Sequence, residues 1–452
     1  MRAILPLLAL AGTALAGPVA AQQQPLTLRR AFAIADSHAY GNRLARSARD
    51  LQAAERDQTF KGILPSVRVE GTWMRTTDPL NAFGSALRQR LLTQSSFDPA
   101  RLNLPDPISN FGMGLVAEVP LLNPDALLGR RAARSATRAA ESSAEWTRGT
   151  TRLDIVRAYY GGVLAREQVT ALEEGVAAAR SHVRLAESML KQGMVTRSDV
   201  LLAEVKAGEL ESALLAARGQ LALANQQLAT ALGVPGDTSL ALPDCLPEMD
   251  RLTPLLAPVE GRPRADVEAA RLGKEAADRD VARATSLLLP RVNSFGRLDW
   301  NDHSSLAGGR SAWSVGLVAS WSLFGGGSEL VARQAALARS DAATAQAEAA
   351  ESKARLELAE RRNELDVAVA TAAIAAKAVD QAAEAHRIVA RKYEGGIATI
   401  TELLESTALE TRTRVERSAA TYRSIVAAAA WRLAAGADVS TITLLEDTRT
   451  ES

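Results

Sequence analysis

The residues Gly114-Leu115-Val116-Ala117 return 202 positions later as Gly316-Leu317-Val318-Ala319, and this repeat is the best guide to the architecture. In the first copy, apolar Phe111 and Met113 continue an alternation with small or polar residues. Alternation with a period of two is typical of a β-strand that has one apolar face. The sequence therefore predicts equivalent strands in the two halves of the chain.

The repeat extends far beyond these strands. Gly193 and Gly396 lie 203 positions apart, and Leu64-Pro65 recurs as Leu289-Pro290. The Leu-Pro pairs are separated by 225 positions, so the first half carries 23 extra residues between Pro65 and the repeated strand. Because an insertion of this kind is tolerated best in a surface loop, we expect one there.

The strand alternation is present in 67–73, 111–119, 291–300 and 313–321, two stretches in each half, and predicts four strands of about ten residues. Strands of this length can cross a membrane at a tilt. One face carries aromatic residues near the strand ends, as at a membrane interface: Trp73, Phe111, Trp313 and Trp321. Two hairpins of a soluble β-sandwich are the alternative. In lipid, four strands would leave open edges, so the chain would have to oligomerise.

A very long helical tract follows each strand pair. No proline lies between Pro124 and Pro235 or after Pro290. Residues 123–193 and 325–396 are therefore free to form helices of about 105 Å each, at 1.5 Å per residue. Shorter return helices are expected from each turn glycine. Because both tracts are rich in alanine, we expect a closely packed bundle about 100 Å long rather than isolated solvated helices.

The overall composition favours long helices and argues against nucleic-acid binding. The 452 residues are 47% hydrophobic but only 4% aromatic, and the formal net charge is +1. Much of the hydrophobic share is alanine, which has the highest helix propensity. A near-neutral chain lacks the basic surface of a nucleic-acid-binding protein. We expect no nucleic-acid partner.

The sequence contains no convincing catalytic or metal-binding motif. His38, His182, His303 and His386 are widely separated and lack the spacing of a metal site or a catalytic triad. Gly325-Gly326-Gly327-Ser328 lacks the lysine of a phosphate-binding loop, and a strand-to-helix turn explains its glycines. We therefore expect no enzyme, no metal and no cofactor.

The two ends and the centre of the chain indicate its divisions. Arg2, an apolar stretch and the small residues Val19-Ala20-Ala21 are typical of a secretory signal peptide. Six prolines between Pro235 and Pro263 exclude a continuous helix. The expected divisions are a signal peptide (1–21), a first repeat (22–233), a proline-rich linker (234–264), a second repeat (265–436) and a C-terminal tail (437–452).

These features together resemble the TolC-type outer-membrane efflux factors. The resemblance covers about 26–436 and rests on the Leu-Pro pairs, on Leu323-Phe324-Gly325-Gly326-Gly327, and on the glycine turns 193–201 and 396–404. It implies a fold of membrane β and long antiparallel helices, in which a homotrimer forms a twelve-stranded β-barrel continued by a twelve-helix tunnel. The implied location is the outer membrane, extending into the periplasm, and the implied partners are outer-membrane lipid, a periplasmic adaptor protein and an inner-membrane transporter. The insertion would lie at the outer rim.

The resemblance also assigns roles to the two glycine turns, which form the periplasmic tip in that family. It places gate-latch residues at Asp199 and Tyr393, and two acidic rings at Glu402 and Glu405. It implies that the adaptor docks on Gly193, Met194, Val195, Thr196, Gly396, Ile397, Ala398 and Thr399. Ala398 stands where the best-known member has a latch arginine, and Arg197 of the first turn is a candidate substitute.

Elementary chemistry supports the acidic rings in part. Glu402 and Glu405 are three residues apart and share a helix face, so three copies could ring a pore and raise one another's pKa. The alternative is an ordinary solvated helix face.

Two classes of function therefore follow from the sequence. One is a passive exit duct for efflux or type I secretion, opened by the adaptor and the pump. The other is a secreted helical scaffold or adhesin stalk. A requirement for detergent would separate them.

Overall fold

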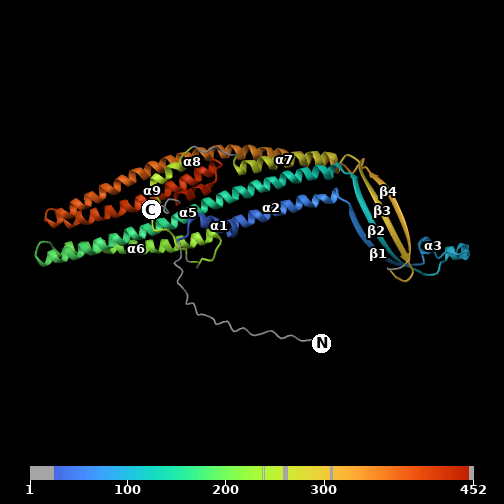
Figure 1. Cartoon of the computed structure of the whole chain (residues 1–452), viewed down its shortest axis with the longest axis horizontal. Coiled ribbons are helices and arrows are strands. Elements are labelled where there is room, and N and C mark those ends of the chain that lie inside the picture. Colours follow the sequence, from blue (N-terminus) through green and yellow to red (C-terminus); the bar gives the residue numbers. More distant parts are fainter. Residues whose placement is uncertain (1–24, 237, 239, 258–262, 306–308, 447–452) are drawn as a thin grey trace, which may run out of the picture.

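The computed structural model describes residues 25–446 except 237, 239, 258–262 and 306–308. The expected signal peptide, 1–21, lies outside this part of the chain. The described chain forms one elongated body, with long helices at one end and a β-sheet toward the other (Figure 1). In the described residues, no helix combines the length and the apolar character that a membrane crossing requires.

The four expected strands are present in a single antiparallel sheet. They are β1 (Ser66–Thr76), β2 (Ile108–Leu122), β3 (Arg291–Asp302) and β4 (Arg310–Ser320). Their order follows the chain, β1-β2-β3-β4, so the two repeats meet where β2 pairs with β3. Trp321, expected within the last strand, lies just after it.

The register gives the sheet two different faces. Val69 pairs with Leu115, Leu115 with Leu298, and Leu298 with Trp313, so these side chains lie on the same face. The large apolar side chains of this face are exposed. We call them the sheet's apolar face, and they are Val67, Val69, Trp73, Leu115, Trp313, Val315 and Leu317. The opposite face carries charged residues, among them Arg68 and Glu118, which form an ion pair of 2.5 Å across β1 and β2.

The two long helical hairpins are close to the expected bounds. They are formed by α5 (Pro124–Lys191) with α6 (Arg197–Leu232) and by α8 (Ser328–Glu394) with α9 (Ile400–Ala434). The longest, α5 and α8, have 68 and 67 residues, which corresponds to about 100 Å. Proline at the first position of α5 and left-handed Gly327 before α8 mark the change from strand to helix.

Three helices precede the strands and were not anticipated from the sequence. They are α1 (Leu28–His38), α2 (Tyr40–Gln58) and α7 (Ala265–Ser286). A one-turn 3-10 helix, Thr59–Gly62, follows α2. Both α2 and α7 lead toward the sheet and pack along α5 (Figure 1). Each strand pair is thus approached by one shorter helix and followed by one long helix.

The insertion of the first repeat is a small folded unit rather than an open loop. It contains α3 (Pro79–Arg88), a 3-10 helix (Gln94–Phe97) and α4 (Pro99–Asn103). It lies beyond the end of the sheet that is farthest from the long helices (Figure 1). The buried Gln89 amide attaches it to β2, with Nε2 donating to the Ser109 carbonyl oxygen at 2.8 Å and to Asn110 Oδ1 at 2.7 Å.

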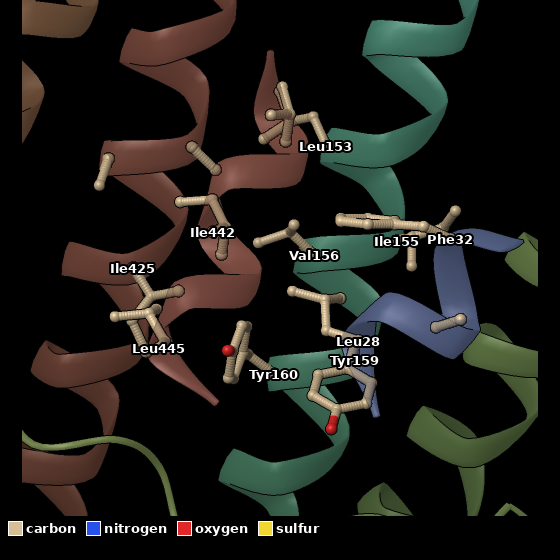
Figure 2. Packing of buried hydrophobic residues seen from close by; sticks show 14 of the residues in the cluster. Leu28, Phe32, Leu153, Ile155, Val156, Tyr159, Tyr160, Ile425, Ile442 and Leu445 are labelled. Carbon is tan, nitrogen blue, oxygen red and sulfur yellow. The ribbon is translucent and has the colours of Figure 1, made fainter. Parts of the chain in front are cut away.

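The main hydrophobic core lies midway along the helical bundle. Figure 2 shows Leu28 of α1 packing beside Tyr159 of α5, with Ile425 of α9 and Ile442 of the C-terminal segment on the other side. The Tyr159 hydroxyl lies 2.7 Å from the Leu26 carbonyl oxygen. This core therefore joins both ends of the described chain to the two hairpins.

The proline-rich segment and the tail also contribute to this core. Residues 234–264 form no α-helix in their described part, but they include the 3-10 helix Met249–Leu255. Leu242, Leu252 and Leu255 of this segment are buried in the core. The tail contains the 3-10 helix Val439–Leu445. The linker is therefore packed against the bundle, because its leucines cover apolar surface that the four long helices leave open.

Candidate gate at the helical tip

Both helical hairpins end in the same glycine turn. Gly193 and Gly396 adopt φ values of +77° and +71°, a left-handed conformation that side chains with a Cβ resist. In the first turn, Met194 N–H donates to the Met189 carbonyl at 2.9 Å. In the second, Ile397 N–H donates to the Lys392 carbonyl at 2.8 Å. These hydrogen bonds satisfy the carbonyls at the helix ends and reverse the chain tightly.

The return helices begin with matching capping boxes. Thr196 and Thr399 accept hydrogen bonds from the backbone N–H groups of Asp199 and Glu402, respectively. In return, Thr196 N–H donates to Asp199 Oδ2 at 2.8 Å, and Thr399 N–H donates to Glu402 Oε2 at 2.7 Å. Thr followed three residues later by an acid is a known helix start, so the beginnings of both return helices could have been predicted from the sequence.

The two expected acidic-ring residues have different surroundings in the single chain. Both Glu402 and Glu405 are exposed on α9. The hydrogen bond from the Thr399 backbone N–H, helped by the Thr399 hydroxyl, lowers the pKa of Glu402 below its ordinary value. Glu405 instead lines a cavity of about 190 Å³ beside Lys206 and Glu209 of α6. A raised pKa through mutual repulsion would therefore require other copies of the chain.

Tyr393 lies inside the tip rather than on its surface. It is 2% exposed and belongs to an apolar group contributed by all four long helices. We call this group the tip cluster, and it consists of Ala186, Met189, Val200, Ala203, Tyr393, Ile400, Leu403 and Leu404. The Tyr393 hydroxyl has no hydrogen-bond partner among the described residues. Burial raises the pKa of Tyr393, and the negative charge of Asp199 raises it further.

The expected latch pair is thus close but not bonded in the single chain. The negative charge of Asp199 raises the pKa of Tyr393. The Asp199 carboxylate, however, accepts hydrogen bonds from Thr196, from its backbone N–H and from its hydroxyl, each at 2.8 Å. Both of these hydrogen bonds are accepted by Asp199 Oδ2.

The eight expected docking residues divide into outward and inward groups. Six are exposed: Gly193, Met194, Thr196, Gly396, Ile397 and Thr399. Met194 and Ile397 present apolar side chains with exposed fractions of 58% and 80%. Val195 and Ala398 pack against the tip cluster. The turns therefore offer one exposed apolar side chain each, supported from within by a smaller one.

Two histidines that are far apart in the sequence meet near this tip. The rings of His182 in α5 and His386 in α8 have centroids 5.9 Å apart. The sequence analysis treated the four histidines as scattered, and their spacing alone did not predict this contact. A signal was present, because they precede Gly193 and Gly396 by 11 and 10 residues, positions that differ by one in the repeat. In the described residues, no group of three or more His, Cys, Asp or Glu side chains is arranged to hold a metal ion.

The model of a single protein family matches both halves of the chain. The family is described as outer membrane efflux protein, and the matched residues are 43–234 and 262–437. The chain belongs to the outer membrane efflux protein family. The match therefore consists of two segments, one in each repeat. The unmatched residues between them fall in the proline-rich stretch. The resemblance drawn from the sequence is confirmed.

Solved structures agree with this outer membrane efflux fold. The outer membrane protein VceC from Vibrio cholerae is 19% identical, with a TM-score of 0.73 over 91% of this chain and 96% of that chain. The Campylobacter jejuni CmeC outer membrane channel is 17% identical, with a TM-score of 0.73 over 92% and 88%. A membrane protein from Pseudomonas aeruginosa is 19% identical, with a TM-score of 0.77 over 90% and 92%. No curated protein matches this chain in sequence.

Proposed function

We propose that this efflux-family protein is the outer-membrane exit duct of a tripartite efflux or type I secretion system. In this role it acts as a passive channel that a periplasmic adaptor and an inner-membrane transporter open. The observation that carries the proposal is the exposure of the sheet's apolar face. The exposed fractions of Val69, Trp313 and Leu317 are 69%, 76% and 70%. A contiguous exposed apolar face of this kind marks a surface that contacts a membrane or another protein, rather than water, in the working protein.

The edges of the sheet support assembly from several copies. Within the described sheet, β1 and β4 each pair on one side only. Unpaired strand edges are not tolerated in lipid, so β4 of one copy would pair with β1 of the next. Three copies would give a closed sheet of twelve strands, the number that the family resemblance implies. The exposed apolar face would then contact outer-membrane lipid.

The other face of the sheet supports a water-filled interior. Arg68 forms ion pairs with Glu70 and Glu118, and Arg297 pairs with Asp299. Charged groups are costly in lipid but stable beside water. A closed sheet with this face inside would form a wet passage, continued by α5, α6, α8 and α9 of three copies as a tunnel through the periplasm.

The tip is proposed to be both the gate and the adaptor site. The tip cluster holds the four helix ends of each chain together, which supports a closed resting state. Asp199 and Tyr393 would latch the helices, while Glu402 and Glu405 would line the entrance. The adaptor would dock on 193–196 and 396–399, where the exposed Met194 and Ile397 supply apolar contacts.

Fractionation and conductance together test the proposed function. The protein should sediment with the outer membrane, require detergent for extraction, and give ion-conducting channels when it is reconstituted into a planar bilayer. Copurification after cross-linking in cells should identify the adaptor and the transporter. A protein that is soluble in buffer and forms no channels would instead be a secreted scaffold or adhesin stalk, and the proposal would be rejected.

A further inference from the structure

The histidine pair joins the two helical hairpins just behind the tip cluster. His182 lies four residues, about one helical turn, before Ala186 of that cluster, and both histidine side chains are partly buried. His182 shares a face of α5 with Ala179 and Ala186, which are both buried. His386 shares a face of α8 with buried Ala382. Each ring therefore projects from an apolar helix face into the contact between the hairpins.

Hydroxyl groups of α9 lie within hydrogen-bond distance of both rings. Thr407 Oγ1 lies 3.2 Å from His182 Nε2 and 3.4 Å from His386 Nδ1, and Ser406 Oγ lies 3.1 Å from His386 Nδ1. Both hydroxyls also lie within hydrogen-bond distance of the Leu403 carbonyl oxygen, at 2.8 and 2.9 Å, and can donate to it. When they do, each hydroxyl accepts from an imidazole N–H, and the pair is held against α9 without any carboxylate.

The charged groups around the pair are mostly engaged with one another. Facing ion pairs join Arg180 to Glu211, Lys206 to Glu209, and Glu384 to Arg387. Glu405 of α9 lines the cavity of about 190 Å³ that Thr407 also lines, together with Lys206 and Glu209. The hydrogen-bond partners of the two rings within the described chain are hydroxyls, so neither ring is hydrogen-bonded to a carboxylate there.

The packed state favours the neutral form of His182. Burial lowers the pKa of His182 below its ordinary value, and the nearby His386 lowers it further. When the hairpins separate and water enters, the ring regains an ordinary pKa of about 6.5. A histidine whose pKa is lowered in the packed state stabilises that state above the ordinary value and destabilises it as the pH falls below that value.

We propose that His182 and His386 form an acid-responsive contact between the α5–α6 hairpin and the α8–α9 hairpin, and that its protonation favours the open channel. This inference rests on the proposed channel function. Two imidazolium groups in a partly buried site repel each other, and the repulsion acts one turn behind the tip cluster, where the same helices must part for the tip to open. The histidines thereby couple the acidity of the surroundings to the gate.

The test is single-channel recording of the detergent-purified protein in a planar bilayer, between about pH 7.5 and about pH 5. The wild type should show a severalfold rise in open probability on acidification. The double variant His182→Gln and His386→Gln should lose this rise, because glutamine keeps an N–H donor for α9 but does not titrate. His303→Gln is the matched control, since that exposed ring lies at the opposite end, after β3, and its variant should respond as the wild type does.

A gain-of-function variant gives the opposite expectation. His182→Lys places a lasting positive charge beside His386, so its open probability at neutral pH should approach that of the acidified wild type. Imidazole titration by NMR in the wild type provides a readout that does not depend on variant folding. His182 should titrate below the ordinary histidine value of about 6.5, and titration at or above that value would overturn the inference.

The outcomes separate the failure of this inference from failure of the proposed function. If the wild type forms no channels at any pH, the proposed function fails. If the channels respond to acid equally in the wild type and the double glutamine variant, the histidine pair is not the switch and the inference is overturned. Loss of the response in Glu405→Gln with retention in the double glutamine variant would assign the effect to the carboxylate and would also overturn it.

Discussion

Asp199 and Glu402 are the acidic residues that cap the two return helices at the tip. Each caps its own helix in the single chain, because a carboxylate three residues into a helix can accept the N–H of the capping threonine. This local role explains why an acid recurs at equivalent places in both repeats. Each cap uses one carboxylate oxygen, Asp199 Oδ2 or Glu402 Oε2, so the proposed role in the gate is compatible with it.

The acidic entrance can be tested without disturbing the helix cap. The double variant Glu402→Gln and Glu405→Gln removes the charges, while glutamine can still accept the capping hydrogen bond. In a planar bilayer, this variant should lose cation preference and block by multivalent cations, with trimer assembly unchanged. The wild-type preference should weaken at high salt, because the Debye length falls to about 3 Å at 1 M.

Glu187→Gln is a suitable control for the acidic entrance, because Glu187 is an exposed carboxylate on α5 near the same tip. Its ion preference should match that of the wild type. An unchanged preference in the double variant would place Glu402 and Glu405 on a solvated face outside the pore.

The turn glycines allow a separate test of adaptor docking. A Cβ added at Gly193 or Gly396 would meet no atom within 4 Å, so a side chain can start at either position without displacing a neighbour. The left-handed backbone costs such a residue about 1–2 kcal/mol, which a protein of this size tolerates. We expect Gly193→Trp and Gly396→Trp to abolish efflux in cells while the amount of trimer stays at the wild-type level.

The matched control is Gly219→Trp, at an exposed helical glycine of α6 that is also free of close neighbours. Efflux should be retained in this variant. Full efflux in both turn variants would show that the adaptor binds elsewhere.

At the scale of elements, the insertion is the clearest difference between the two repeats. It is packed onto β2 through Gln89, yet it lies beyond the sheet and contributes no strand. The second repeat joins β3 and β4 with the seven residues 303–309. The sheet can therefore pair its strands in register without a folded unit at that end.

We expect that replacing 78–106 by a seven-residue connection leaves trimer assembly intact. Light scattering in detergent and resistance of the sheet to proteolysis would measure this. Gln89→Ala is the milder companion variant, which should detach the insertion from Asn110 and expose it to protease. Loss of assembly in the shortened protein would mean that the insertion is needed for folding.

At the scale of the whole molecule, the open sheet requires neighbouring copies. The exposed apolar face suits lipid, but the single-paired edge strands β1 and β4 would leave unsatisfied backbone groups there in an isolated chain. We expect the detergent-extracted protein to have the mass of three chains, as measured by light scattering with correction for bound detergent. A stable monomer that keeps its complete β-structure would contradict the proposed assembly.

The sequence by itself determined the features that depend on neighbouring residues. Period-two alternation predicted four strands, proline-free alanine-rich tracts predicted the long helices, and Gly193 and Gly396 marked their turns. These features follow from local backbone preferences and from which face of an element is apolar, and both can be read in a short window. The repeat then allowed a family resemblance, and through it Asp199 and Tyr393 were singled out.

Only the tertiary structure decided which distant side chains meet. The burial of Tyr393, the packing of Leu252 against the bundle, the docking of Gln89 on β2 and the contact between His182 and His386 all join segments far apart in the chain. Such contacts depend on the rotation and offset of one helix or strand against another, which periodicity leaves open. Local patterns therefore specify the elements, whereas close packing among them creates the partly buried surroundings that shift pKa values and can give a residue a role in gating.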